Sequence, residues 1–365
     1  MKANKRHPFF RLSNARRIMA LWGIFLFSMS GHAQDLEGTL QQLSEDAAKM
    51  YVMPISSALA TNVNGAWFHK APKAQAFGFD LEIGVVAMGS FFPTDRTRFE
   101  TTGQFTFSVS EAQNLVSGVS DPQIRNELIA QLTTTPSTVN ISGATIIGSS
   151  NDYITISFPG GTYQTSYGQV TLPSQQIQLP VAGFGELAEV NLLPLATPQV
   201  TVGTVMGTQA VLRYLPSTAI NDDLGKLSYF GFGIQHNPLV WLGGFPFPVD
   251  VAVGFYRQNA ALGDVFSLKA TAYGLNISKQ FGTRFFNITP YAGYLVEQAT
   301  MQVNYAYVVD TPGGPISQEI AFELEGENKS RIVLGINLRF LLINLNLDYN
   351  LGTYDSITAG LNLAL

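Results

Sequence analysis

The sequence predicts an all-β protein: a transmembrane antiparallel β-barrel of about 12 to 14 strands, with a short N-terminal helical segment as plug or cap. Three observations carry this prediction. Apolar and polar side chains alternate from Ile332 to the last residue, Leu365, and a basic, apolar leader opens the chain. Charged residues make up only 13% of the sequence, against about 25% in typical soluble domains, while aromatic residues reach 12%. Because chain ends fray unless something holds them, a strand pattern that persists to Leu365 indicates a terminus paired with a neighbour.

The leader has the features of a secretory signal peptide. A basic stretch precedes an apolar run over residues 18–30, which is too short for a comfortable membrane helix, and a small-x-small triplet follows at 31–33. We therefore expect residues 1–33 to be cleaved. Six of the 21 Lys and Arg residues lie there, which leaves 15 against 26 acidic residues and a net charge of about −11. This charge argues against a nucleic-acid partner, and a chain without cysteine forms no disulfide.

The strongest pattern lies at the C-terminus. Even-numbered residues are apolar from Ile332 to Phe340, and odd-numbered residues are apolar from Leu341 onward. Opposed residues of a hairpin share a face, so this change of phase marks a turn with a loop of even length. We predict a hairpin in which Leu338 lies opposite Ile343. The phase then stays odd, so residues 352–356 form a loop of odd length before the last strand.

Such two-faced strands fit either a soluble sandwich or a membrane barrel. In the sandwich the apolar face points inward, whereas in the barrel it meets lipid and the polar face lines a lumen. Strands of 9 to 11 residues or more favour the barrel, because sandwich strands average five or six. Aromatic clusters at 91–92, 241–247 and 284–286 suit the two interfacial girdles. Since the backbone must be paired in lipid, the sheet has to close.

Earlier strands follow from the same alternation. They are predicted over residues 79–85, 200–205, 209–214, 227–235, 249–256, 266–278 and 288–297. Two further apolar-alternating stretches, 301–309 and 316–324, flank a strong turn signal at 311–315. They form either one long hairpin over about 286–340, with its tip clear of the membrane, or two shorter hairpins broken at 326–330.

The barrel is expected to span residues 77–365. Two regions are expected to differ from its wall, one inside this range and one before it. Residues from about 110 to 190 are expected to be irregular, extracellular loops with one helix from Asp121 to Leu132, because Asp at the cap and Pro at the first position favour a helix start. Residues 34–76 begin with apolar residues at helical spacing and meet a proline break at Pro54. This segment either plugs the lumen or caps the periplasmic rim.

The parity of the strands predicts which residues face the lumen. These are Arg213, Asn337, Arg339, Asn344, Asn346, Asp348 and Asn362. They either line a pore or form a hydrogen-bonded network that fills a narrow barrel. Asparagine is neutral and both donates and accepts hydrogen bonds, so this lumen is expected to be polar with few charges, unlike an ion-selective constriction.

We find no pattern that indicates an enzyme. Beyond the leader only His69 and His236 remain, far apart in the sequence, and neither a zinc-binding spacing nor a Gly-x-Ser-x-Gly elbow is present. We therefore predict no catalytic residue, no metal site and no cofactor.

Several segments resemble a known family. "ALATNVNGAWFHKAP", "FGFDLEIGVVAMGSFFP", "GFGIQHNPLVWLGGFPFPVDVAVGFY" and "NITPYAGY" are similar to those of an uncharacterised family of outer-membrane β-barrels common in Bacteroidetes-type bacteria. More distantly, a helical segment that leads into a barrel resembles the long-chain fatty acid transporter family, whose members have 14 strands and carry hydrophobic compounds past a plug. This chain lacks a clear Asn-Pro-Ala segment of that family.

The pattern and the resemblance lead to one expected function and one alternative. We expect a bacterial outer-membrane protein that is a passive channel for small molecules, hydrophobic ones included; the alternative is a surface-exposed structural or adhesive barrel without transport activity. The expected partners are outer-membrane lipid, a small hydrophobic ligand and the barrel assembly machinery. That machinery would recognise the last strand, from Ile357 to Leu365, although many families end in Phe or Trp rather than Leu.

Overall fold

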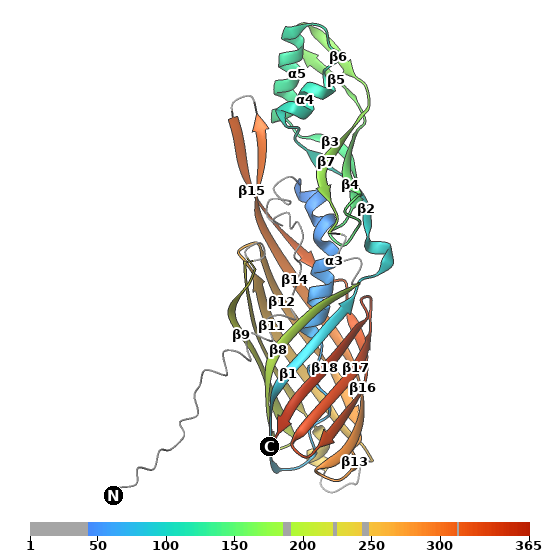
Figure 1. Ribbon diagram of the computed structural model, residues 1–365, viewed down its shortest axis with the longest axis vertical. Coiled ribbons are helices and arrows are strands. Elements are labelled where there is room, and N and C mark those ends of the chain that lie inside the picture. The colour runs from blue at the N-terminus through green and yellow to red at the C-terminus, as the bar shows by residue number, and fades with distance from the viewer. Residues whose placement is uncertain (1–42, 185–190, 222–224, 243–247, 312–313) are drawn as a thin grey trace, which may run out of the picture.

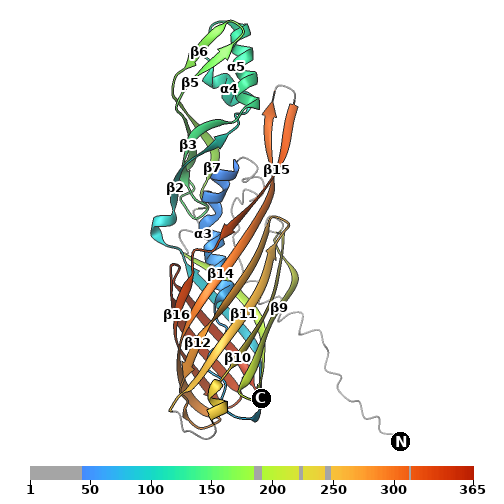
Figure 2. The same ribbon diagram turned by 180° about the vertical axis from the view of Figure 1, so that it is seen from behind.

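A computed structural model describes residues 43–184, 191–221, 225–242, 248–311 and 314–365 of the chain. The expected signal peptide, residues 1–33, and the first part of the N-terminal segment lie outside the described residues. The molecule is elongated (Figures 1 and 2). The barrel forms one end, and a narrower folded unit extends from one rim of the barrel and forms the other end.

Ten strands form the closed wall of the barrel in the described part of the chain. They are β1 (Phe77–Phe91), β8 (Leu192–Val205), β9 (Thr208–Asn221), β10 (Gly225–His236), β11 (Asp250–Leu262), β12 (Phe266–Ser278), β14 (Phe286–Thr311), β16 (Ser330–Phe340), β17 (Ile343–Leu351) and β18 (Ser356–Ala364). Each pairs antiparallel with its neighbours, and β18 pairs with β1 to close the ring. The expected number of 12 to 14 was too high, because the additional apolar stretches fold outside the wall.

The two faces of the wall differ as the alternation predicts. On β17, the outward side chains of Ile343, Leu345 and Leu347 are 40–50% exposed. The inward side chains of Asn344 and Asn346 are at most 6% exposed. A closed sheet with an apolar outside and a polar inside is the arrangement of a membrane barrel.

The C-terminal hairpins confirm the parity but not the predicted register. Leu338 pairs with Leu345 rather than with Ile343. The predicted register would have put Phe340 opposite Leu341 and left no residue for a loop, whereas a two-residue loop at Leu341 and Leu342 lets Leu341 adopt a positive φ of 55°. The next loop is odd, as predicted, although it spans 351–355 rather than 352–356.

The two rims of the barrel are different. At one rim, which we call the short-turn end, chain reversals occur at Met206 and Gly207 and at Leu341 and Leu342, and the C-terminus lies there (Figure 1). The minor elements η2 (Pro238–Leu242) and β13 (Phe281–Gly282) also connect strands at this end. Exposed aromatic side chains gather on these turns and the adjoining strand ends: Phe77, Phe79, Trp241, Phe281, Phe285, Phe286 and Phe340.

The predicted aromatic clusters are only partly in the girdles. At the other rim, the long-loop end, the Phe91 and Tyr349 rings lie 6.5 Å apart at the end of the wall. Phe92 is 4% exposed and belongs to the hydrophobic core, so its assignment to a girdle was wrong. Residues 243–247 lie outside the described residues.

A folded unit follows β1 where irregular loops were expected. After η1 (Thr94–Arg96), four strands form one antiparallel sheet: β2 (Arg98–Phe105), β3 (Ser137–Ala144), β4 (Tyr153–Phe158) and β7 (Gln175–Ala182). The hairpin β5 (Gly161–Thr165) and β6 (Gly168–Leu172) and the helices α4 (Val109–Leu115) and α5 (Pro122–Thr134) complete it. We call residues 98–182 the cap unit. Helix α5 starts as predicted, with the Asp121 carboxylate accepting from the Gln123 and Ile124 amides.

One long hairpin stands beside the cap unit (Figure 1). Strand β14 pairs with β16 over residues 286–296 and then with β15 (Gly314–Glu325) over residues 300–311. Residues 326–329 interrupt only the returning side. The long-hairpin alternative is therefore the one that the structure contains.

Helix α3 (Glu45–Asn64) begins beyond the long-loop end, where it contacts β2 and β15, and its last part enters the barrel. Its course is bounded by the wall strands β1, β8, β11, β12 and β14. The proline break predicted at Pro54 was wrong: the helix continues through this buried residue, and packing on all sides offsets the one backbone hydrogen bond that proline cannot make. None of the described helices is long and apolar enough to cross a membrane.

Strand β18 closes the wall by pairing with β1, and we call this junction the seam. The first prediction concerns the removal of β18. This strand pairs with β17 and β1 along most of its length, and the Leu365 amide donates to the Leu81 carbonyl at 2.8 Å. Deleting residues 360–365 should abolish insertion, because the barrel would be left with open edges in lipid. Heat-modifiable migration of the membrane fraction measures this. Deletion of the β5–β6 hairpin in the cap unit is the control and should leave insertion intact; normal assembly without residues 360–365 would contradict the seam.

Candidate functional site

The lumen is the candidate site, and helix α3 fills its upper half. Over residues 56–61 the helix carries small side chains except at Leu59, and Ser56, Ser57, Ala58, Ala60 and Thr61 are all at most 2% exposed. A narrow barrel has room for little more than its own inward side chains. A helix with small side chains is therefore one that fits here.

The top of the helix is bonded to both structures beyond the rim. The Tyr51 hydroxyl donates to the Ala182 carbonyl of the cap unit at 2.9 Å, and the Ile146 amide donates to the Tyr51 carbonyl at 3.0 Å. From the long hairpin, the Tyr305 hydroxyl donates to the Leu43 carbonyl at 3.0 Å. Burial raises the pKa of the Tyr51 hydroxyl, so it stays a hydrogen-bond donor.

A buried ion pair holds the lower end of the helix. Arg331 on β16 and Glu297 on β14 are 1% and 2% exposed, and two nitrogens of the guanidinium face the two carboxylate oxygens. Arg331 also donates to the Thr61 carbonyl at 2.7 Å, and the Asn64 amide donates to Glu297 at 3.3 Å. Gln258 on β11 donates to the Asn64 side-chain oxygen. Three wall strands thus bind the last turn of α3, where the helix dipole favours a cation.

Arg213 donates hydrogen bonds to the carbonyl groups of the two residues that follow the helix. Its guanidinium is fully buried, donates to the Gly65 carbonyl at 2.9 Å and the Ala66 carbonyl at 2.5 Å, and donates to Gln199 at 2.9 Å. It also lies 3.9 Å above the ring of Trp67. One side chain of β9 therefore holds the two residues after the helix and positions Trp67, the first aromatic residue that follows.

An aromatic layer closes the middle of the lumen. Trp67 stacks on Tyr256 with ring centroids 5.1 Å apart, and Phe68 meets Tyr291 edge-on at 6.1 Å. Glycines in the wall make the space. A Cβ at Gly231 would lie 2.8 Å from Trp67, one at Gly233 2.4 Å from Tyr256, and one at Gly293 2.4 Å from Phe68. These positions exclude any larger residue as long as the rings stay in place.

A charged cluster holds the chain near the short-turn end. Lys70 lies 3.0 Å from the Asp80 carboxylate and 2.5 Å from that of Glu82, and the His69 Nε2 atom is 2.9 Å from Glu82. His69 and Glu82 are 5% and 1% exposed. Asn237 donates to the Pro72 carbonyl at 2.7 Å. We call α3 together with residues 65–72 the plug.

The two histidines have different partners. His236 lies at the end of β10, where its Nδ1 is 3.0 Å from the Thr208 hydroxyl and its Nε2 accepts from Trp241 at 3.1 Å. His69 is in the charged cluster described above. Within the described residues there is no group of three or more His, Cys, Asp or Glu side chains placed to hold a metal ion.

The structure places six of the seven lumen candidates in the interior. Arg213, Asn337, Asn344, Asn346, Asp348 and Asn362 are 0–6% exposed on the inner face. Tyr291 and Asn350 both donate to Asp348 at 2.7 Å. Arg339 pairs with Asn344 and shares its face, but it lies at the short-turn end, where it is partly exposed and donates to the carbonyls of Leu341 and Ala364 at 3.1 and 3.3 Å. With this burial the lumen is filled by protein at the level of these residues.

Sequence reasoning missed the residues that hold the plug. Glu82, Gln258, Glu297 and Arg331 all occupy inward positions of strands that the alternation had identified. The parity that selected Arg213 would also have selected them. Their pairing with the plug, however, was not visible in any local pattern.

These features define a class. A closed antiparallel barrel with an apolar outside, a polar inside and an internal helix is a transmembrane β-barrel of the outer-membrane type. The chain belongs to the DUF6588 family, a family of unknown function, whose model matches residues 14–365. None of the curated proteins matches the chain.

Several solved outer-membrane proteins are similar at low identity. A loop L8 deletion mutant of OmpT from Vibrio cholerae is 11% identical, with 80% of this chain and 100% of that chain covered and a TM-score of 0.23. The outer membrane channel DcaP of Acinetobacter baumannii is 10% identical over 81% and 100%, with a TM-score of 0.18. An anion-selective porin from Comamonas acidovorans is 9% identical over 79% and 99%, with a TM-score of 0.16. The resemblance to the fatty acid transporters gains no support from these comparisons.

The buried ion pair generates the second prediction. Glu297→Ala leaves the Arg331 charge buried without its partner, so we expect the free energy of unfolding to fall by about 3–5 kcal/mol. The double variant Glu297→Leu with Arg331→Met removes both charges and should be closer to the parent. Urea unfolding in lipid vesicles, followed by the fluorescence of buried Trp67, measures both. Equal stability of the single variant and the parent would show that the pair does not hold the plug.

Proposed function

We propose that this protein is a membrane anchor that presents the cap unit and the long hairpin at the cell surface, with its own lumen closed by the plug. The observation that carries the proposal is the set of bonds made by one helix. Helix α3 is hydrogen-bonded to the cap unit through Tyr51 and to the wall through Thr61 and Asn64. Leu43, two residues before the helix, is hydrogen-bonded to the long hairpin through Tyr305. The plug therefore connects the barrel wall to the cap unit and the long hairpin.

The orientation follows from the lengths of the connections. Outer-membrane barrels have short periplasmic turns and longer extracellular loops. The short-turn end, with the C-terminus, would then face the periplasm, and the cap unit would stand outside the cell. The alternative expected from the sequence, a structural or adhesive surface barrel, is thus the one that we favour.

The cap unit is suited to exposure. Residues 98–182 include only two basic and five acidic residues and are rich in Ser, Thr and Gln. Its hairpin is fastened to α5, because the Ser166 amide and hydroxyl both donate to Glu127, which holds the pKa of that carboxyl below its usual value. Phe107 packs edge-on against Phe105 and Phe158 in its core. The unit is a folded body with a polar, weakly charged surface.

A passive channel for small molecules, hydrophobic ones included, is the second candidate. The inner face of β16–β18 favours it, because Asn337, Asn344, Asn346 and Asn362 would contribute neutral polar groups to the lining if the plug were displaced. Such a channel needs the plug to move out of the lumen. A plug that stays in the lumen is therefore compatible with the membrane anchor, whereas it would block the channel.

A reversible cross-link separates the two candidates. A Cβ built on Gly326 would lie 3.0 Å from that of Ala60, which is close enough for a disulfide with a small backbone adjustment, and the chain has no other cysteine. For Ala60→Cys with Gly326→Cys in liposomes we expect no swelling with small sugars, whether oxidised or reduced. Swelling in the reduced form that oxidation stops would refute the closed anchor and establish the channel.

Surface labelling tests the orientation. Tyr167 in the cap unit is 60% exposed, so Tyr167→Cys should react with a membrane-impermeant maleimide on intact cells. Arg284→Cys, at the short-turn end, is the matched control and should react only after the outer membrane is permeabilised. The reverse pattern would place the cap unit in the periplasm and exclude surface presentation.

A further inference from the structure

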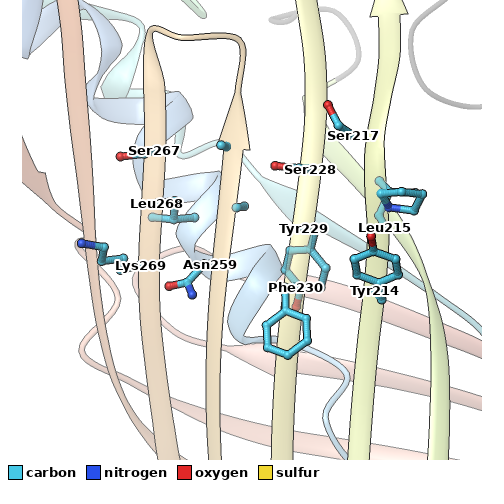
Figure 3. A pocket seen from close by; sticks show the side chains of 13 residues that line it. Tyr214, Leu215, Ser217, Ser228, Tyr229, Phe230, Asn259, Ser267, Leu268 and Lys269 are labelled. Atoms are coloured by element: carbon cyan, nitrogen blue, oxygen red, sulfur yellow. The ribbon is translucent and has the colours of Figure 1, made fainter.

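A hollow of about 300 Å³ lies on the outer face of the wall formed by β9 to β12 (Figure 3). Side chains that line it include those of Tyr214, Ser228, Phe230, Asn259, Ser267 and Lys269. Tyr214 and Phe230 are 56% and 44% exposed, whereas the intervening Tyr229 is 2% exposed and faces the barrel interior. The hollow therefore opens toward the surroundings of the barrel and not toward the plug.

The hollow arises because two neighbouring rows of outward-facing residues, each running across the strands, differ in side-chain size. Tyr214, Phe230, Asn259 and Lys269 form one row across the four strands. In the next row toward the long-loop end, Ser228 pairs with Ala261, and Ala261 pairs with Ser267. The small side chains of this second row leave space above the first row. The Ser228 hydroxyl and the Asn259 amide border that space. The Ser267 hydroxyl donates to Gln302 at 3.4 Å and keeps its acceptor capacity.

The outer face beside the hollow carries two cations. Arg257 pairs with Thr271, and Asn259 pairs with Lys269, so Arg257 and Lys269 are diagonal neighbours at about 7–8 Å on the same face. Both side chains are exposed. Among the ion pairs of the described residues, none includes either of them.

The surface on the other side of the cations is apolar. Toward the short-turn end, the next outward positions are occupied by Phe255 and Tyr273, which pair with each other and are 39% and 51% exposed. Leu275 and Val253 follow with 54% and 44%. Charges on a lipid-facing wall are tolerated near the interface and costly deeper down, so Arg257 and Lys269 mark the margin of the apolar belt on these strands.

We propose that this surface binds a phosphate-bearing membrane lipid. Arg257 and Lys269 hold the phosphate, since a guanidinium and an ammonium within reach of one anion form charge-assisted hydrogen bonds. The hollow receives the rest of the headgroup, to which Ser228, Asn259 and Ser267 offer hydrogen bonds. The acyl chains extend over the apolar surface of Phe255 and Tyr273. A soluble anion would use the cations but gain nothing from that apolar surface, and this favours a lipid.

Native mass spectrometry of the full chain in detergent tests the proposal, with phosphatidylglycerol as the probe and dioleoylglycerol as its uncharged counterpart. Arg257→Gln with Lys269→Gln should lower phosphatidylglycerol binding about tenfold, because both charge-assisted contacts are lost. Lys279→Gln with Arg284→Gln removes the same charge at the short-turn end. This control should bind phosphatidylglycerol as the parent does.

A second variant tests the hollow apart from its charges. Ser228→Trp fills the space and keeps both cations, so phosphatidylglycerol binding should fall although the net charge is unchanged. Heat-modifiable migration shows whether each variant is folded. Full binding by the folded double variant, equal binding of dioleoylglycerol, or displacement of phosphatidylglycerol by inorganic phosphate at equal concentration would each overturn the lipid site.

Discussion

The structure depends on one constraint: a helix ends inside a membrane barrel, and the residues of its last turn are buried there. Unpaired carbonyls of a helix end are costly in such surroundings. Arg331 meets the Thr61 carbonyl, and Arg213 meets those of Gly65 and Ala66. Two arginines of the wall thus bind the last turn of the helix and the two residues after it, while the Trp67 indole donates to the Val63 carbonyl. A buried cation in turn requires a partner, and Glu297 supplies it for Arg331.

The glycines of the wall follow from the same constraint. Once the helix has ended, the chain must continue through the lumen, and Trp67 and Phe68 fill the space that it crosses. The wall opposite these rings can then carry no side chain at Gly231 or Gly293. Plug and wall are therefore matched residue by residue, and a change in one requires a change in the other.

The sequence predicted the wall well because membrane strands are long and alternate strictly. Strand β12 was predicted over the residues that it occupies, and the turn between β16 and β17 was found from a change of phase alone. The cap unit was missed because its strands have only five to eight residues. The pairing of Leu338 was off by two residues, since parity does not count the residues that a loop needs.

For the lumen, parity found Arg213 and the asparagines but not their partners. Facing inward is a property of a strand and can be read locally. The contact of Arg331 with Thr61 joins residues 270 positions apart, and the continuation of α3 through Pro54 depends on surrounding walls that no local pattern contains. Residues that face a lumen are thus easier to predict than what they touch.

The course of the plug has a consequence for how the molecule is made. The chain runs down the lumen through α3 and residues 65–72, reverses at the short-turn end and only then becomes β1, whose partner at the seam is the last strand, β18. The first described part of the chain is thus enclosed by a ring that its final residues complete. Assembly of this fold therefore has two requirements: the wall must enclose the plug, and β18 must join β1.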